Sequence, residues 1–226
     1  MRIDRDRFFA AYTGAFGAIK ASQKQGLNDL LAAAEGDGNI TDIRWLAYMF
    51  ATVKHECGDE WQPIREYSRG KGRPYGEPVT VTDSAGKTYT NVYYGRGFVQ
   101  LTWKGNYQQM GTTLKNRMLY EPDLALNPEI AYQVMSLGMR TGSFTGKKLA
   151  NYIHDDVCDY VNARRIINGT DQAQRIAGYA VKLEAILRAS VVAAMPGVPV
   201  PSAEPVAPVL PVPGVAPSIP VVQGGM

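Results

Sequence analysis

The residue types best suited to chemistry gather in one short run, residues 93–103, which reads YYGRGFVQLTW. Its apolar residues would hold the run to a core. If the run is extended, its polar residues share one face, because successive side chains of a strand point to opposite sides. The polar residues are Arg96, Gln100 and Thr102. Beside the rings of Tyr94 and Trp103, they would make a wall that stacks on sugar faces and bonds sugar hydroxyls. The alternative is a buried hairpin edge with its glycines at a bulge.

A second candidate is Glu56, at the end of a helix predicted over residues 43–57. Thr41 or Asp42 would cap the start of this helix, and Gly58 would end it. The negative end of the helix dipole and partial burial both disfavour a charged carboxylate there. Both effects favour the protonated form that a general acid needs. Without its neighbours, Glu56 would be interpreted as an ordinary surface glutamate.

The two stretches together resemble glycoside hydrolase family 19, which includes chitinases and many phage endolysins. The resemblance lies in His55-Glu56 followed by Gly58, and in YYGRGFVQLTWKGNY over residues 93–107. It extends from about Ile43 to about Leu187. It implies a mainly α, lysozyme-like fold, which is α+β with a small β-hairpin beside the cleft. It also implies hydrolysis of β-1,4 glycosidic bonds by an inverting acid/base mechanism.

Inverting hydrolysis needs an acid that protonates the leaving oxygen and a base that activates water. The resemblance makes Glu56 the acid. Glu66 and Glu60 are the candidates for the base, with Asp59 ranked below them, and the position of Glu66 is similar to that of the second acid in phage members. Thr102 stands where plant enzymes have a serine that holds the attacking water.

The resemblance also implies a set of substrate-binding residues. Gln100 and Asn106 match polar residues of the family cleft, and Tyr94 matches its substrate wall. Asn168 resembles the family's Asn-Gly turn residue, and Arg175 resembles its cleft arginine; otherwise they are a turn residue and a solvated helix face. With the two candidates from the run itself, the predicted substrate-binding residues are Tyr94, Arg96, Gln100, Trp103, Asn106, Asn168 and Arg175.

The chain differs from plant chitinases in having two cysteines and no apolar signal segment at its charged N-terminus. It is therefore more similar to a phage or prophage endolysin that acts on peptidoglycan glycan strands. Such a protein is expected in the cytoplasm of the bacterial host until a holin releases it to the cell wall. The alternatives are a chitinase and an inactive cell-wall-binding module.

Composition narrows the partners further. The net charge is +3 and the basic residues are scattered, which argues against nucleic acid but suits an anionic polymer such as a cell wall. His55-Glu56 lacks a second histidine four residues on, so we expect no metal site and no cofactor. Cys57 and Cys158 are expected to be reduced core thiols. No segment is apolar for long enough to span a bilayer, and a monomer is expected.

Hydrophobic periodicity predicts a helical domain over residues 1–190. The Pro-rich composition of residues 191–226 predicts a flexible tail. A hairpin is predicted from residues 79–82 and 87–93, around a turn at 83–86. Helices are predicted over residues 4–16, 22–34, 43–57, 106–114, 124–137, 149–166 and 172–189.

Overall fold

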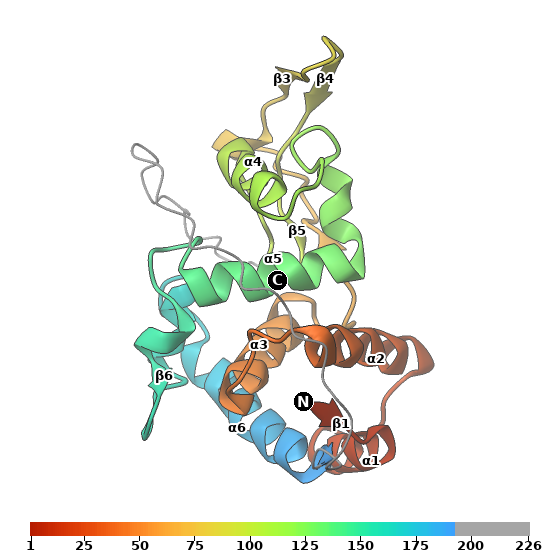
Figure 1. The fold of residues 1–226 in the computed structure, drawn as a ribbon, viewed down its shortest axis with the longest axis vertical. Coiled ribbons are helices and arrows are strands. Elements are labelled where there is room, and N and C mark those ends of the chain that lie inside the picture. The colour runs from red at the N-terminus through yellow and green to blue at the C-terminus, as the bar shows by residue number, and fades with distance from the viewer. Residues whose placement is uncertain (193–226) are drawn as a thin grey trace.

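The structure is a computed structural model and describes residues 1–192 (Figure 1). Its α-helices are α1 Arg5–Phe16, α2 Ala21–Gly36, α3 Ile43–Glu56, α4 Lys104–Thr113, α5 Pro128–Thr141 and α6 Ala173–Ser190. Short 3₁₀ turns are η1 Pro74–Gly76, η2 Pro122–Leu126, η3 Leu149–Asn151 and η4 Asn162–Ile166. The strands are β1 Arg2–Ile3, β2 Ile64–Arg65, β3 Val79–Thr82, β4 Thr88–Asn91, β5 Arg96–Gly97, β6 Ile153–His154, β7 Val157–Cys158 and β8 Val191–Val192. The predicted mainly helical fold is confirmed.

Helix α3 is the centre of the core and carries the first candidate acid. The Asp42 side chain accepts a hydrogen bond from the Arg44 backbone N–H and caps the helix, as predicted. Every residue from Leu46 to Lys54 is buried, and α3 packs along α6, which also packs against α1 (Figure 1). The helix ends at Glu56, and Gly58 follows with a positive φ of 57°. This fixes Glu56 at the edge of the core.

Antiparallel pairs join distant parts of the chain. Strand β1 pairs with β8, with Arg2 opposite Val192, so the N-terminus is fastened to the end of α6. The predicted hairpin is formed by β3 and β4 and projects from the body of the molecule (Figure 1). Strand β2 pairs with β5, which brings residues 64–65 against the run 93–103. Apart from residues 191–192 in β8, the predicted tail lies outside the described residues.

The run 93–103 is not one extended strand, so the prediction of a single polar face was wrong. The backbone groups of Arg96 and Leu101 bond each other in both directions, which closes a tight loop between them. Gln100 and Trp103 have positive φ angles of 52° and 69°, and Gly97 has one of 87°. Such angles break the alternation of a strand. The Arg96 side chain is consequently buried, and it does not share a face with the side chains of Gln100 and Thr102.

The helix predicted over residues 149–166 was also wrong. The segment instead contains η3, the hairpin β6–β7 and η4. Asp155 adopts a positive φ of 42° at the hairpin turn. The Ile153 carbonyl accepts a hydrogen bond from the Trp45 indole at 2.8 Å, a bond that takes the place of a helical partner.

The cysteines are both free thiols, but only one of them is in the core. Cys57 is buried next to Glu56, as predicted, whereas Cys158 is exposed in β7. Its exposure follows from the hairpin that replaces the predicted helix. None of the described helices is both long and apolar enough to cross a membrane.

Candidate active site

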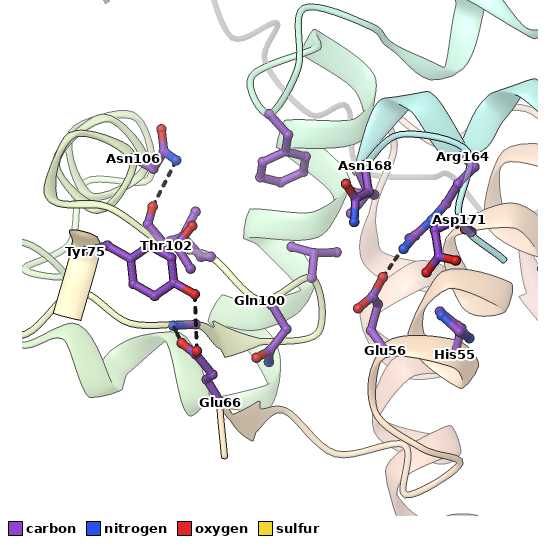
Figure 2. A pocket seen from close by; sticks show the side chains of 15 residues that line it. His55, Glu56, Glu66, Tyr75, Gln100, Thr102, Asn106, Arg164, Asn168 and Asp171 are labelled. Carbon is purple, nitrogen blue, oxygen red and sulfur yellow. Dashed lines mark hydrogen bonds and ion pairs between the residues drawn. The ribbon is translucent and has the colours of Figure 1, made fainter. Parts of the chain in front are cut away.

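A pocket separates two walls that bring the candidate acids to opposite sides (Figure 2). One wall comes from the segment after β2, the run 93–103 and α4. The other comes from the end of α3 and from η4 with the residues after it. Apolar Val99, Phe144 and Ile167 also line the pocket. The polar residues of the pocket are His55, Glu56, Glu66, Tyr75, Gln100, Thr102, Asn106, Arg164, Asn168 and Asp171.

Glu66 is held in the first wall by three hydrogen-bond donors. Its Oε1 accepts from the Ser68 hydroxyl at 2.7 Å and the Tyr75 hydroxyl at 3.1 Å, and its Oε2 accepts from the Gly95 backbone N–H at 3.0 Å. Its own backbone N–H donates to the Gly95 carbonyl at 2.7 Å. A carboxylate accepts and cannot donate, so this set of donors suits the ionised side chain.

Two neighbours fix the geometry around Glu66. Burial and the Glu66 carboxylate raise the pKa of Tyr75 to about 12, so Tyr75 remains a donor at neutral pH. The Tyr75 ring packs edge-on against Trp103, with centroids 5.5 Å apart. A Cβ on residue 95 would lie 2.8 Å from the Gln100 Oε1 and 3.3 Å from the Glu66 Cβ. Glycine at position 95 therefore permits the close approach of both side chains.

Glu56 makes an ion pair in the second wall. Its Oε1 accepts a hydrogen bond from Arg164 at 2.6 Å, and their side chains are 18% and 4% exposed. Arg164 also donates from Nε to the Asp171 carbonyl at 3.1 Å, which fixes the plane of the guanidinium. Among the described residues, no group donates to the Glu56 Oε2. Oε2 is therefore the Glu56 oxygen without a hydrogen-bond donor in this part of the chain.

His55 lies beside Glu56 and lines the same pocket. Burial lowers its pKa, and the Arg164 and Arg175 guanidiniums act in the same direction against the Glu56 carboxylate. The imidazole is therefore neutral at pH 7, since its ordinary pKa is already about 6.5.

The predicted cleft residues divide into two groups. Gln100, Thr102, Asn106 and Asn168 line the pocket with Glu56 and Glu66. The Asn106 side chain donates to the Thr102 carbonyl, and the Gln100 amide donates to the carbonyls of Ile64 and Gly97. These bonds stiffen the first wall. Their predicted contacts with sugar stay predictions.

The structure places the other predicted substrate-binding residues outside the pocket. Tyr94 and Arg96 are buried together, with the guanidinium 3.6 Å above the ring, and Trp103 reaches the site only through Tyr75. Arg175 is exposed on the first turn of α6. The buried positions of Tyr94 and Arg96 fit a supporting role in the wall, and the predicted sugar contacts of Trp103 and Arg175 stay predictions.

The competing candidates for the base also lie outside the pocket. Glu60 is exposed, and Asp59 forms an ion pair with buried Lys54. Of the three carboxylates considered, Glu66 is the one that lines the pocket.

The Asp123 carboxylate stabilises the wall that carries Glu66. This carboxylate accepts from Arg65 at 2.8 Å and from buried Arg96 at 2.7 Å, and these residues are opposite each other in the β2–β5 pair. Burial alone would raise the pKa of Asp123, but the hydrogen bonds from the two arginines lower it. The folded-state pKa is therefore below the unfolded value of about 3.9. The stabilisation is present above that value and is lost as pH falls through the folded pKa.

We therefore expect Asp123→Asn to lower the free energy of unfolding by about 1 kcal/mol at neutral pH, a figure discounted because Asp123 is largely exposed. The deficit should shrink as pH falls from about 4 through the folded pKa of Asp123, because the wild-type carboxyl is then protonated too. Urea unfolding at both pH values measures it. Exposed Asp156→Asn is the control, and an equal deficit at both pH values would contradict the assignment.

Sequence reasoning missed several pocket residues. Arg164 fell inside the helix wrongly predicted over 149–166, where its side chain had no expected partner. Tyr75 fell in a Gly- and Pro-rich loop, where an isolated aromatic residue is the one available signal. The sequence around Asp171 and Phe144 contained no signal of a role in the pocket. Within residues 1–192, no cluster of histidine, cysteine and carboxylate side chains could hold a metal ion.

Comparisons with known proteins concern the family and the fold. The sequence model of glycoside hydrolase family 19, chitinase class I, matches residues 11–186, so the match begins well before the resemblance noted at Ile43. Two endochitinases of Arabidopsis thaliana are 38% and 37% identical over 92 residues, which are 40% of this chain and 30% of each relative. The chain thus aligns with under a third of the length of these relatives.

Solved structures share the fold. Chitinase C from Streptomyces griseus HUT6037 is 21% identical, with a TM-score of 0.53 over 79% of this chain and 75% of that one. A bacterial family 19 chitinase is 22% identical, with a TM-score of 0.52 over 82% of this chain and 94% of that one. At these identities the likeness concerns the fold, and it agrees with the predicted lysozyme-like architecture.

Proposed function

The chain belongs to glycoside hydrolase family 19, the chitinase class I family, and on that premise we propose that it hydrolyses the β-1,4 glycosidic bonds of bacterial peptidoglycan. One observation carries the proposal: Glu56 and Glu66 reach a single pocket from opposite walls (Figure 2). Two carboxyl groups in unlike surroundings are what glycosidic hydrolysis needs.

The surroundings of the two carboxyl groups support a separate role for each in this proposal. Glu66, held by three donors, is the base that takes a proton from the attacking water. Thr102 lies on the same wall and would hold that water through its hydroxyl. Glu56 protonates the leaving oxygen from its free Oε2, while Arg164 fixes its other oxygen. Water attacks the face of the sugar opposite the leaving group, so the product is inverted.

The choice of polymer is the finer part of the proposal. The net charge of +3 favours an anionic wall polymer over an uncharged one. In the cell the protein would be an endolysin that lyses its bacterial host after release by a holin. The second candidate is chitin, which is favoured by the named activity of the endochitinase relatives. An inactive wall-binding module is the third, and two intact carboxylates in the pocket argue against it.

The test is a parallel digestion by the full chain. Purified Gram-negative sacculi and soluble chitin hexamer are incubated separately, and new reducing ends are identified by mass spectrometry. We expect disaccharide-peptide fragments from sacculi and at least about tenfold slower cleavage of chitin, a difference of roughly 1.4 kcal/mol in activation free energy. Chitin cleavage without wall fragments would select the second candidate. No product from either polymer would select the binding module.

A further inference from the structure

Three cations beside the cleft lack a counter-ion. Arg69, Lys71 and Arg73 are exposed, and none forms an ion pair or side-chain hydrogen bond within residues 1–192. Three other arginines near the site are paired: Arg65 and Arg96 share Asp123, and Arg164 holds Glu56. Three exposed cations without a counter-ion in the described residues therefore lie close together in one loop.

The loop is anchored on the cleft at both ends. Glu66 precedes it and Tyr75 follows it, and both side chains line the pocket on the same wall (Figure 2). Residues 67–74 must therefore lie at the rim of that wall. Between Arg65 and Glu77 the carboxylates are Glu66, which points into the pocket, and Glu77 itself, so the outer surface of the loop is cationic.

The loop is also held in one shape. Backbone bonds run from the N–H of Arg69 to Glu66, of Lys71 to Ser68 and of Arg73 to Gly70, at 3.1, 3.0 and 2.9 Å. The chain just after the loop passes so close to the middle of the loop that a Cβ on residue 76 would lie 1.8 Å from the Gly70 carbonyl oxygen. A loop that is ordered before binding loses less entropy when it binds.

An aromatic ring stands among these cations. The Tyr67 side chain is fully exposed, directly after Glu66. A large exposed ring at a rim can stack on a sugar face while its hydroxyl stays in water. Cations and a ring together match a glycan that carries negative charge.

We propose that residues 67–73 form an anionic-glycan rim, which selects peptidoglycan through the carboxylates of its stem peptides. Tyr67 stacks on the glycan strand, and Arg69, Lys71 and Arg73 attract the stem carboxylates. Chitin carries no such charge and gains nothing from the three cations. The inference rests on the proposed function for its substrate, but the rim is tested by binding alone.

The test measures dissociation constants for sacculi by co-sedimentation. Every protein is the full chain carrying Glu66→Gln, so hydrolysis does not affect the result. The loop variant is R69Q/K71Q/R73Q. The control K20Q/K24Q/K182Q removes the same charge from exposed lysines before α2, in α2 and in α6. A second set of the same sacculi is amidated with carbodiimide and glycinamide to neutralise the stem carboxylates.

We expect the loop variant to bind untreated sacculi about tenfold more weakly at low salt, as three exposed charge pairs together would give, and the control less than about twofold. The difference should vanish on amidated sacculi and near 0.5 M salt, where the Debye length is only about 4 Å. Equal weakening by the control, equal weakening on amidated sacculi, or no weakening would each overturn the proposal. Loop-dependent binding to anionic lipid vesicles but not to sacculi would also overturn it.

The two proposals fail separately. If the active chain releases no wall fragments but the rim still binds sacculi, the proposed reaction is wrong and the rim stands. If wall fragments are released but the loop variant binds normally, the rim is wrong and the reaction stands.

Discussion

Replacing Glu66 with glutamine should lower kcat at least about 10²-fold on the polymer that the enzyme cleaves, because the attacking water would lose its base. The amide keeps the size of the side chain, and its oxygen can still accept from Tyr75 or Gly95. The fold should therefore survive, and the loss should appear in kcat. Initial rates on purified glycan, with circular dichroism as a check of folding, measure the effect.

Glu60→Gln is the matched control, since Glu60 is an exposed carboxylate six residues before Glu66 and outside the pocket. Its rate should stay within about twofold of wild type, as for a surface change that touches no reacting atom. Proton NMR of the first wild-type product should show the α-anomer before mutarotation, because a base that activates water inverts the centre. A β product would make Glu66 a nucleophile, and full activity of Glu66→Gln would remove it from the reaction.

The two candidate acids show what could and what could not be predicted from the sequence. Glu56 was placed correctly by local signals: the cap at Asp42, an apolar helix, and Gly58 after its end. Glu66 was chosen by family resemblance and could not be placed by periodicity, because it lies in a loop. Its position depends on the β2–β5 pair, which joins residues about thirty positions apart.

The run 93–103 shows where pattern reasoning fails. Alternation predicted that Arg96 would share a face with Gln100 and Thr102, but positive φ angles after Gly97 reverse the direction of the side chains. The decisive partner of Arg96 is Asp123, which lies in η2. Such a long-range ion pair leaves no periodic trace in a single sequence, and the same holds for Arg164 with Glu56.

The Glu56–Arg164 pair leads to the second large effect. Glu56→Gln should lower kcat on natural glycan by at least about 10²-fold, since an amide cannot protonate the leaving oxygen. A dinitrophenyl leaving group departs without being protonated. On a glycoside that carries this group, Glu56→Gln should therefore recover most of its activity. Glu66→Gln should not recover, because water attack is still required. Recovery by Glu66→Gln instead would exchange the two roles.

In Glu56→Gln, a loss of folding stability must be distinguished from the loss of the general acid. Arg164 is 4% exposed, and without the Glu56 carboxylate its charge stays buried with a carbonyl and an amide as partners. We expect Glu56→Gln to be about 1–3 kcal/mol less stable than wild type, the usual cost of leaving a buried group unsatisfied. The double variant Glu56→Gln/Arg164→Gln removes the unpaired charge and should regain part of that stability while remaining inactive on natural glycan. Restored activity in the double variant would mean that the single variant lost its fold rather than its acid, and Glu56 would then be a structural partner of Arg164.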